Sequence, residues 1–379
     1  MQDGVRFSAT EQELKASYQL RYKVYVEYMG RFKDMGDHEL KELKDEYDDY
    51  ARAVIAVKDG AAIGTLRLFW GRDKDFPPLM IDAYHLSPFL DKLEQQQICI
   101  VERLMVDKHY RGGSATLRMY KEVMHFVLDH HIEAVLLNCE PHHLNSYLKL
   151  GFRPFTQTYS YPGIGLVIPM VLITGDYEHL QRVGSPFYML TREEDFSHCR
   201  FVSVLQNTIA QHPSIVSQTT LGKADFLKQI YDSADPLVTT EAKIFSALDQ
   251  DEIERMLEKS HIIECKKGTH IIQKDNAAKT MFILLSGILE ILRDGQLQAV
   301  IYPGDVIGEI SFFLHVPRTA DIIAATENVK LLSLDEASLS RLLKYDHTLA
   351  NKILMNICRN LCTRVMGTEI QQLASKSSA

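Results

Sequence analysis

The 379-residue sequence predicts an α/β domain, with a mixed sheet flanked by helices, followed by a helical connector and an all-β, jelly-roll-like barrel with flanking helices. Two observations predict this fold class. In the first half, apolar runs of strand length alternate with segments of helical spacing, and after residue 260 short β-branched segments are separated by glycines. At roughly 100–200 residues per domain, the length allows two or three domains. We place the boundaries at 1–190, 191–240 and 241–379.

The first half predicts strands and helices in alternation. Two apolar runs flank the turn KDGAA and indicate a hairpin. The near-continuous apolar run ICIVERLMV is typical of a strand covered on both faces, and a second such run, GIGLVIPMVLI, comes later. The expected elements are strands at 53–57, 63–69, 98–106, 133–139 and 163–173, and helices at 114–131 and 143–150.

The second half opens on a helix start and continues as short strands. Asp249 precedes Glu252 by three residues, which is the spacing of a capping box. Glycines then separate the β-branched segments, as the turns of a small barrel or sandwich require. The expected strands are 270–273, 281–285, 288–293, 298–302 and 329–334, closed by helices over 335–366.

Composition narrows the classes of partner. The formal net charge of −8 and the lack of a local basic patch predict no nucleic-acid binding. The N-terminus has no secretory signal pattern, and the apolar run at 163–173 is shorter than the ~20 residues of a membrane helix, so we expect a cytoplasmic protein. Without CxxC spacing, we expect no metal and reduced core thiols at Cys99, Cys139, Cys199, Cys265, Cys358 and Cys362.

The stretch GEISFFLHVPRTA, residues 308–320, carries the chemistry of a small-ligand pocket. Arg318 offers a guanidinium fork suited to phosphate oxygens. Glu309 accepts hydrogen bonds only, so a ribose hydroxyl is its expected partner, and Gly308 allows close approach of the backbone. The motif predicts a pocket for a phosphorylated sugar, and the alternative is an ion pair that caps a loop.

This stretch resembles the phosphate-binding cassette of cyclic nucleotide-binding domains, and the resemblance covers about residues 241–366. It implies that Glu309 holds the ribose 2′-hydroxyl and Arg318 the cyclic phosphate. Ile307 and His315 depart from the aromatic and the glycine that are frequent there. cAMP and cGMP both remain open as the ligand. The implied pocket residues are Gly308, Glu309, Ile310, Ser311, Arg318, Thr319 and Ala320.

Two motifs in the first half indicate acyl transfer. The turn HYRGGSAT joins a buried strand to a helix, whose free N–H groups favour a phosphate. NSYLKLGF then resembles the acyl-donor half of the GNAT acyltransferases, where Tyr147 would protonate the departing thiolate. A simple βα turn and a packed tyrosine are the alternatives. The expected donor-binding residues are Leu104, Val106, Arg111, Gly112, Gly113, Ser114 and Ala115.

A narrower resemblance extends over about residues 5–190. LRYKVYVEYMGRF, DEYD, IGTLRLF and ERLMV resemble the autoinducer synthases, and VIPMVLITGDYEHLQRVGSPF resembles the N-acyl amino acid synthases of that branch. The resemblance implies transfer of a fatty acyl group from acyl carrier protein or acyl-CoA to an amine. The residues that match its charged positions, expected to bind the amine substrate, are Arg21, Asp45, Asp48, Arg67 and Arg103.

The general base is less defined by the sequence. Ile100 stands where the autoinducer synthases carry a glutamate, so Glu102 is our candidate. Strand alternation predicts that Glu102 and Arg103 point to opposite faces. The other candidates are His109, Glu140 and His142.

Together these motifs predict an acyltransferase that acylates an amine, with an amino acid as the expected acceptor, under control of a cyclic nucleotide. The alternatives are a nucleotide-gated protein lysine acetyltransferase that uses acetyl-CoA, and a sensor without enzymatic activity. We expect nucleotide binding to rearrange the helices after residue 335 and the segment 184–240. Chain length of the donor, identity of the amine, sign of the regulation and oligomeric state stay open.

Overall fold

The computed structural model divides into two compact units, each described here by itself. The first comprises Met1–Thr156 and Ile168–Pro213, and the second Gln157–Val167 and Ser214–Ala379. The structure describes residues 1–191, 199, 201–210, 215–217, 223–233, 244–257, 260–277, 280–334 and 336–377. The stretch expected as a separate connector is divided instead, because helix α8 (Val202–Ala210) falls in the first unit and α10 (Lys223–Ser233) in the second.

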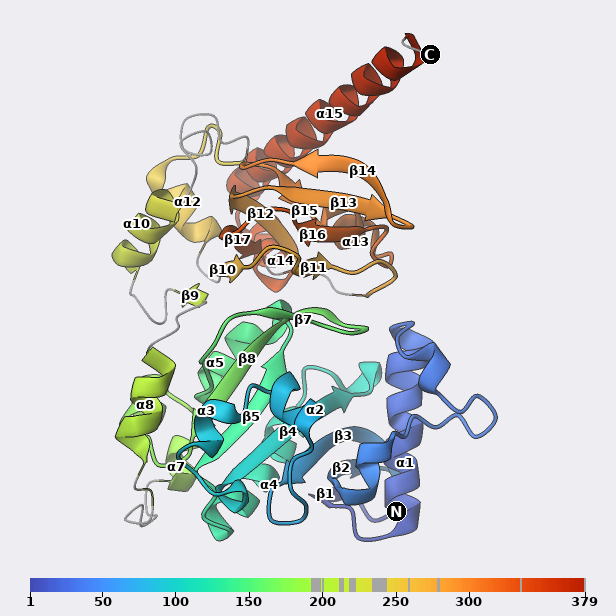
Figure 1. The fold of residues 1–379 in the computed structure, drawn as a ribbon, viewed down its shortest axis with the longest axis vertical. Coiled ribbons are helices and arrows are strands. Elements are labelled where there is room, and N and C mark those ends of the chain that lie inside the picture. The colour runs from blue at the N-terminus through green and yellow to red at the C-terminus, as the bar shows by residue number, and fades with distance from the viewer. Residues whose placement is uncertain are drawn as a thin grey trace. The chain divides into compact units, whose positions relative to one another are not determined.

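The first unit is built on a mixed β-sheet, as the sequence predicts (Figure 1). Its strands run in the order β1-β2-β3-β4-β5-β8-β6, with β7 paired to β8. The pair β4–β5 is parallel, and the other pairs are antiparallel. The strands are β1 (Gly4–Phe7), β2 (Arg52–Lys58), β3 (Ala61–Trp70), β4 (Ile98–Val106), β5 (Ala134–Cys139), β6 (Arg153–Pro154) and β8 (Gly165–Ile173), whereas β7 (Tyr159–Tyr161) and residues 165–167 of β8 belong to the second unit.

Helices cover this sheet and complete the predicted α/β pattern. The expected helices 114–131 and 143–150 are confirmed as α4 and α5. α4 packs against β3 at Gly64, where an added Cβ would lie 2.9 Å from the methyl carbon of Met119. The helices are α1 (Glu11–Arg21), α2 (Pro78–Ala83), α3 (Ser87–Leu90), α4 (Ala115–Asp129), α5 (Leu144–Leu150), α6 (Tyr177–Arg182) and α7 (Tyr188–Thr191).

Short helical turns complete the first unit. η1 (Tyr22–Tyr28) is a π-helix that continues α1 directly, a type of turn that is frequent at functional sites. The remaining turns are η2 (Lys33–Met35), η3 (Glu46–Tyr50), η4 (Gln95–Gln97), η5 (Lys108–Tyr110) and η6 (Pro141–His143).

Strands β4 and β5 separate at their carboxyl ends. They pair only where Ile98–Ile100 meets Ala134–Leu136, and no further β4–β5 pair occurs among the described residues. The two strand ends are therefore left with backbone groups that do not bond to each other.

A β-bulge distorts β4 at the same level. Arg67 of β3 lies opposite Glu102, but Thr65 lies opposite Met105, so β4 contains one extra residue there. Arg103 in the bulge has φ = 50°, a left-handed conformation that is rare for a residue with a side chain. Bulges of this kind re-aim side chains and are frequent beside active sites.

The second unit is a β-sandwich, which confirms the expected small barrel or sandwich. Its sheets have the orders β15-β12-β17-β10-β9 and β11-β16-β13-β14. Leu285, Leu332 and Ile353 are among the fully buried residues of its core. The strands are β9 (Ile215–Ser217), β10 (His261–Cys265), β11 (His270–Ile272), β12 (Met281–Ser286), β13 (Leu289–Arg293), β14 (Gln296–Ile301), β15 (Val306–Ile307), β16 (Asp321–Ala324) and β17 (Val329–Leu334).

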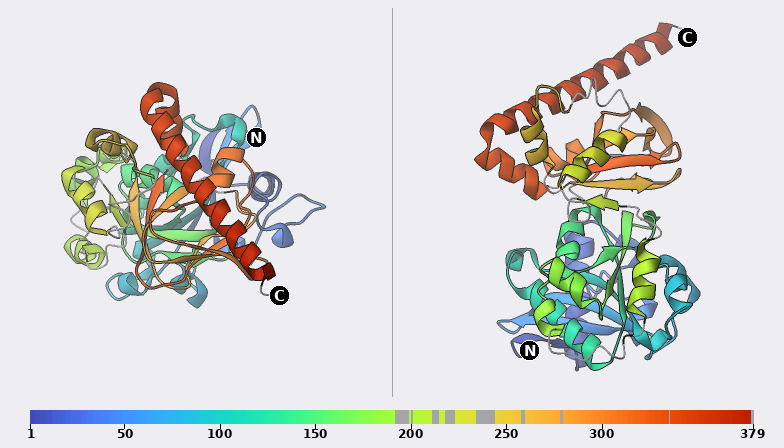
Figure 2. Two further views of the ribbon diagram at one scale, coloured as in Figure 1. Left: turned by 90° about the horizontal axis from the view of Figure 1, so that it is seen from above. Right: turned by 90° about the vertical axis from the view of Figure 1, so that its left-hand side faces the viewer.

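Helices flank the sandwich at both ends of its sequence. The predicted capping box is confirmed, since Asp249 and Glu252 exchange side-chain and backbone hydrogen bonds at the start of α12. α15 is long and extends beyond the sheets (Figure 2). The helices are α12 (Gln250–Met256), α13 (Glu309–Leu314), α14 (Glu336–Tyr345) and α15 (His347–Ser377).

The six cysteines are free, but they are not all in the core. Cys99, Cys139 and Cys265 are buried, whereas Cys358 and Cys362 are exposed. The prediction of core thiols is wrong for these two, because they lie on the outer side of α15.

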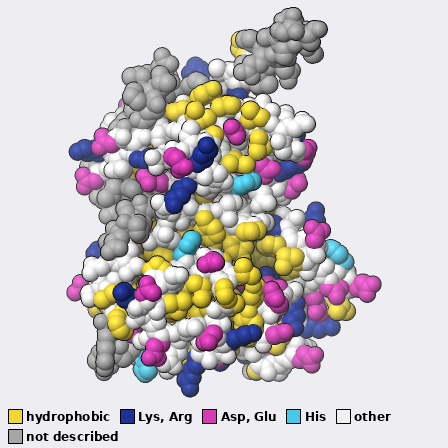
Figure 3. Space-filling view, viewed as in Figure 1, with side chains coloured by type: hydrophobic (Ala, Val, Ile, Leu, Met, Phe, Trp, Pro, Cys, Tyr) yellow, Lys and Arg dark blue, Asp and Glu magenta, His cyan; other side chains and the backbone are white. Residues whose placement is uncertain are grey.

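The distribution of charged side chains on the surface bears on the expectation that the chain has no local basic patch. On the face seen in Figure 3, acidic and basic side chains are intermixed, and neither sign forms a continuous region. Within the described parts of the chain, no helix is long and apolar enough to cross a membrane. The same residues contain no group of three or more metal-ligating side chains.

Candidate active site and candidate nucleotide pocket

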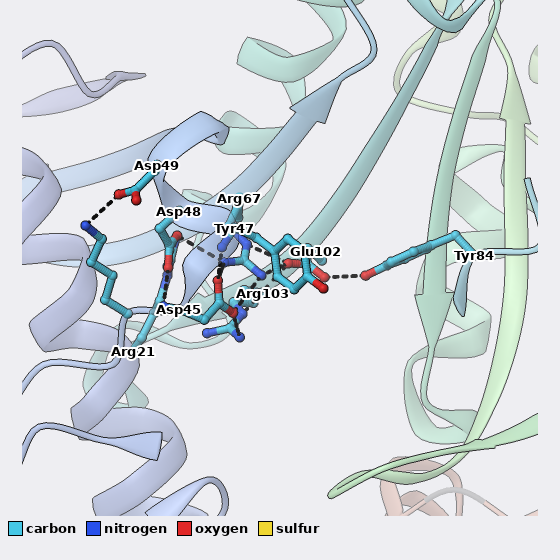
Figure 4. Close-up of polar contacts among 10 residues, drawn as sticks. Arg21, Asp45, Tyr47, Asp48, Asp49, Arg67, Tyr84, Glu102 and Arg103 are labelled. Atoms are coloured by element: carbon cyan, nitrogen blue, oxygen red, sulfur yellow. Dashed lines mark hydrogen bonds and ion pairs between the residues drawn. The ribbon is translucent and has the colours of Figure 1, made fainter. Parts of the chain in front are cut away.

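An ionic network joins η3 to the strands β3 and β4, with Arg67 at its centre (Figure 4). Arg67 is only 2% exposed. Its Nη1 donates to an oxygen of Asp45 at 2.6 Å and lies 3.1 Å from an oxygen of Asp48, and its Nε donates to Glu102 at 2.5 Å. One buried cation therefore holds three carboxylates from two segments that are far apart in the sequence.

The two aspartates of the DEYD motif, Asp45 and Asp48, both cap the helical turn η3 and pair with arginines of the network. The side chain of Asp45 accepts the backbone N–H of Tyr47, and that of Asp48 accepts the backbone N–H of Asp45, so the pair caps η3. The fully buried Arg21 donates to Asp48 at 2.5 Å. Burial opposes the ionisation of Asp48, but Arg21 and Arg67 outweigh it and hold its pKa at about 2.

Glu102 and Arg103 point to the same side, so the expectation of opposite faces is wrong. The bulge at Arg103 interrupts the alternation of side chains along β4. Arg103 donates through Nη2 to Asp45, and its Nε lies 3.8 Å from the carboxylate of Glu102. The five residues expected to bind the amine substrate thus form one network, together with Glu102.

Glu102 is held as an ionised carboxylate. Burial opposes this, but Arg67 and Arg103 bring its pKa below the usual range, and the hydroxyl of Tyr84 donates to it from the far side (Figure 4). A carboxylate with a lowered pKa is a weak base. The geometry therefore favours a positioning role for Glu102 over the role of general base.

A second group of polar side chains, called here the Tyr147 group, consists of Tyr147, Tyr120, Arg31, Glu140 and His142. The hydroxyl of Tyr120 donates to that of Tyr147, with 3.1 Å between the oxygens. Arg31 donates both terminal nitrogens to Glu140, at 2.8 and 2.9 Å, and this pair holds the pKa of Glu140 at about 2 against the effect of burial. His142 lies 4.0 Å from the same carboxylate.

Tyr25 connects the two groups. Burial raises the pKa of its hydroxyl, and Arg103, Arg31, Glu140 and Glu102 all act on it electrostatically. Burial likewise raises the pKa of Tyr147, on which Glu140 and Tyr25 act in turn. Residues of the ionic network and of the Tyr147 group therefore both act electrostatically on one tyrosine, Tyr25 of η1.

The expected donor-binding turn lies between β4 and α4. Gly112 has φ = 79°, which glycine adopts without strain, and Arg111 donates to the backbone oxygen of Val106 at 3.2 Å. Ser114 is the N-cap of α4 but makes no side-chain bond to the first turn of that helix. The first N–H groups of this 15-residue helix remain available to a ligand or to water. His109 lies in the exposed turn η5.

In the second unit, Arg318 is buried under the helical turn that the sequence predicts. It donates to the backbone oxygens of Gly308 at 2.9 Å and Thr280 at 2.5 Å. Gly308 has φ = 81°, and a Cβ there would lie 2.5 Å from Arg318 Nη1. Only glycine fits at residue 308 while Arg318 keeps this position.

Glu309 has a partner that the sequence does not predict. Arg364 of α15 pairs with its carboxylate and also donates to the backbone oxygen of Val306 at 3.0 Å. Both Glu309 and Arg318 are 3% exposed. The two residues expected to bind ribose and phosphate are therefore held in place by protein groups, and one of these comes from the last helix.

The other expected pocket residues surround this pair. Ser311 is buried, and its hydroxyl lies 3.4 Å from the backbone oxygen of Pro317, whereas Ile310 and Thr319 are exposed and Ala320 is half-buried. His315, where a glycine is frequent in the family, ends α13 with φ = 54°. The backbone thus keeps the conformation suited to glycine although the residue differs.

A hairpin of the second unit is bonded to Glu264 of β10 and to Asn276 in the loop after β11. The hydroxyl of Thr158 donates to the backbone oxygen of Glu264 at 2.7 Å, and the side chain of Asn276 donates to the backbone oxygen of Ile164. Asn276 in turn accepts the backbone N–H of Arg318 at 2.9 Å. The segment 157–167 is therefore connected to the pocket by two successive hydrogen bonds.

Comparison with known families distinguishes the two units. Residues 16–176 match the model of the N-acyl amino acid synthase FeeM, and residues 262–346 match that of the cyclic nucleotide-binding domain. The chain joins a FeeM domain to a cyclic nucleotide-binding domain. Both resemblances drawn from the sequence are thereby confirmed.

Curated relatives match one domain or the other. The L-ornithine N(alpha)-acyltransferase of Rhodobacter capsulatus is 30% identical over 138 residues, which are 34% of this chain and 52% of that protein. The cAMP-dependent protein kinase regulatory subunit of Yarrowia lipolytica is 28% identical over 100 residues, 26% of each chain. The chain thus spans about half the length of the first relative and less of the second.

Solved structures resemble each domain at low identity. A CoA-dependent acyl-homoserine lactone synthase is 19% identical, with a TM-score of 0.37 over 48% of this chain and 91% of that one. A cyclic nucleotide-binding domain from Methylobacillus flagellatus is 21% identical, with a TM-score of 0.37 over 43% of this chain and 90% of that one.

Several residues of the FeeM domain and of the nucleotide-binding domain escaped prediction from the sequence. Arg31 lies within the matched motif LRYKVYVEYMGRF, but nothing local indicates its partner Glu140. Tyr84 and Arg364 lie in segments without a recognisable motif. Their role depends on contacts over long separations in the sequence, which only the fold supplies.

Proposed function

We propose that the FeeM domain transfers an acyl group from a thioester carrier, acyl-CoA or acyl carrier protein, to the amine of an amino acid. The observation that carries this proposal is the separation of β4 from β5, with an arginine-rich network on β4 and Tyr147 in the helix α5 that follows β5 in the chain. The match to FeeM and the likeness to an L-ornithine N(alpha)-acyltransferase support the same chemistry.

The separated strand ends suit the donor. The pantetheine arm of a thioester carrier is extended and contains amide groups, which pair with free strand backbone in the manner of an added strand. Among the described residues, the backbone of β4 near Leu104 and Val106 forms no strand pair on the β5 side, although the Val106 oxygen accepts a hydrogen bond from Arg111. The carrier's phosphate would then reach the first N–H groups of α4 beyond Gly112 and Gly113.

Tyr147 supplies the proton for the leaving group. Its raised pKa keeps the hydroxyl protonated around neutral pH, so it can donate to the thiolate as the tetrahedral intermediate collapses. The carbon–nitrogen bond has formed by then, and breaking of the carbon–sulfur bond restores the carbonyl as an amide and releases the thiol. Tyr120 donates to the Tyr147 oxygen and fixes its position.

The base that takes the amine proton is best assigned to His142. Glu102 and Glu140 are weak bases because their arginine partners lower their pKa values. His109 lies in an exposed turn. His142 Nδ1 lies 4.0 Å from the carboxylate of Glu140, and an imidazole nitrogen can accept a proton.

Product analysis tests the proposed activity. The purified chain is incubated with acetyl, octanoyl and palmitoyl donors, as CoA and as carrier-protein thioesters, against a panel of free amino acids and a lysine peptide. We expect an N-acyl amino acid, identified by mass spectrometry. Acetylation of the peptide alone would instead support a protein acetyltransferase. Binding of donor without any product would support a sensor without enzymatic activity.

We propose further that a cyclic nucleotide in the second domain changes the rate of acyl transfer. A bound phosphate would compete with two backbone oxygens for Arg318, whose backbone is bonded to Asn276 and through it to Ile164. The hairpin continues into β8, where Ile168 pairs with Cys139, the residue before Glu140. This chain of bonds supports a route from the nucleotide to the catalytic group.

The route makes a specific prediction for Asn276→Ala. This variant should still bind the nucleotide, because Asn276 contributes a backbone oxygen that alanine retains. Its rate of acyl transfer should no longer respond to the nucleotide. An unchanged rate response, with binding measured by calorimetry as a control, would contradict the proposed route.

A further inference from the structure

The arginines of the ionic network differ in how fully they are bonded. Arg67 is bonded to three carboxylates. Arg21 keeps two unbonded nitrogens, but its side chain is 0% exposed, so no substrate reaches it. Arg103 is 13% exposed, and its buried Nη1 has no hydrogen-bond partner in the described part of the chain.

The backbone holds Arg103 in this position at a cost. A left-handed conformation is unfavourable for a residue with a side chain, and Arg103 adopts it in the bulge of β4. The bulge brings the guanidinium to the side of Glu102 and Tyr25 rather than to the opposite face of the sheet. A buried donor without a partner beside a strained backbone indicates that a ligand completes the arrangement.

The charges of the network limit what that ligand is. Three arginines face three carboxylates, Asp45, Asp48 and Glu102, so their formal charges cancel. A guanidinium nitrogen only donates, and its strongest partners are carboxylates and phosphates. A free amino acid is a carboxylate with an amine and has no net charge overall, which suits a balanced network.

The direction of the substrate follows from Tyr25. Arg103 and Glu140 both act electrostatically on Tyr25, and Tyr25 and Glu140 both act on Tyr147. A carboxylate on Arg103 would direct the amine of the same small molecule past Tyr25 toward the thioester.

We propose that Arg103 binds the α-carboxylate of the acceptor amino acid and so selects free amino acids over amines that lack this group. This inference rests on the proposed acyltransferase function. Arg103 is the specificity-determining residue, while Arg21 and Arg67 keep the carboxylates of the network in place.

Paired acceptors test the proposal. The rate constant kcat/KM is measured for the best amino acid and for its α-carboxamide, which has the same shape but no carboxylate. The chain with Arg103 should prefer the acid by about 10- to 100-fold. Arg103→Met should lose this preference through a higher KM for the acid, with the KM for the donor unchanged.

Two further variants separate the guanidinium from the fold. Arg103→Gly removes the side chain while allowing φ = 50° without strain, and it should lose the same preference. Arg52→Met removes an arginine that pairs with Asp73 elsewhere in the domain and should keep the preference. A preference that survives in Arg103→Met and Arg103→Gly would overturn the role of Arg103 alone. No turnover with any amino acid would overturn the proposed function and this inference together.

Discussion

Tyr147→Phe is expected to reduce the rate of acyl transfer by about 10²- to 10⁴-fold, the range for loss of a general acid. Tyr147 lies in α5 directly after β5, bonded to Tyr120 and within electrostatic range of Glu140. Phenylalanine keeps the ring but has no proton for the thiolate. The loss should appear in kcat, and the KM for the donor should change little.

The matched control for this prediction is Tyr188→Phe. Tyr188 packs against Tyr177 in the same unit and belongs to neither polar group. Unfolding midpoints of both variants should stay near that of the parent chain. Full activity of Tyr147→Phe would mean that this tyrosine only packs in the fold.

Arg67→Met is expected to destabilise the FeeM domain by about 3–5 kcal/mol, the range for removing one member of a buried ionic group. The substitution keeps the length of the side chain but leaves Asp45, Asp48 and Glu102 without their shared cation. At about 2–4 °C for each kcal/mol, the unfolding midpoint should fall by roughly 10 °C. Acyl transfer should be lost at temperatures where the variant is still folded.

Arg52→Met serves as the control for charge alone. Its side chain is 42% exposed and pairs with Asp73, so the loss should be below about 1 kcal/mol. An effect of Arg67→Met as small as that of Arg52→Met, measured by chemical denaturation, would contradict the central position of Arg67. The pKa of Asp48 should also rise in Arg67→Met, because one of the two arginines that lower it is gone.

The sequence predicts most of the architecture because the signal is local. The hairpin around KDGAA, the buried strands and the capping box at Asp249 each depend on neighbouring residues, and all appear in the structure. The motif GEISFFLHVPRTA also predicts its short helix, α13, between two strands.

The site is less predictable because it depends on departures from regular structure. Strand alternation places Glu102 and Arg103 on opposite faces, but one extra residue in β4 cancels that rule. Glu309 and Arg364 are 55 residues apart, and no sequence spacing indicates their pairing. Charged motifs indicate which residues matter, whereas their partners follow from the fold.

Nucleotide control of acyl transfer is tested most directly by the initial rate of amide formation as cAMP or cGMP is added, in the intact chain and in Arg318→Met. If the nucleotide controls acyl transfer, the rate should change saturably, with a midpoint equal to the dissociation constant of the nucleotide. The rate of Arg318→Met should not change. A chain that binds the nucleotide and forms product at the same rate with and without it would contradict nucleotide control of acyl transfer.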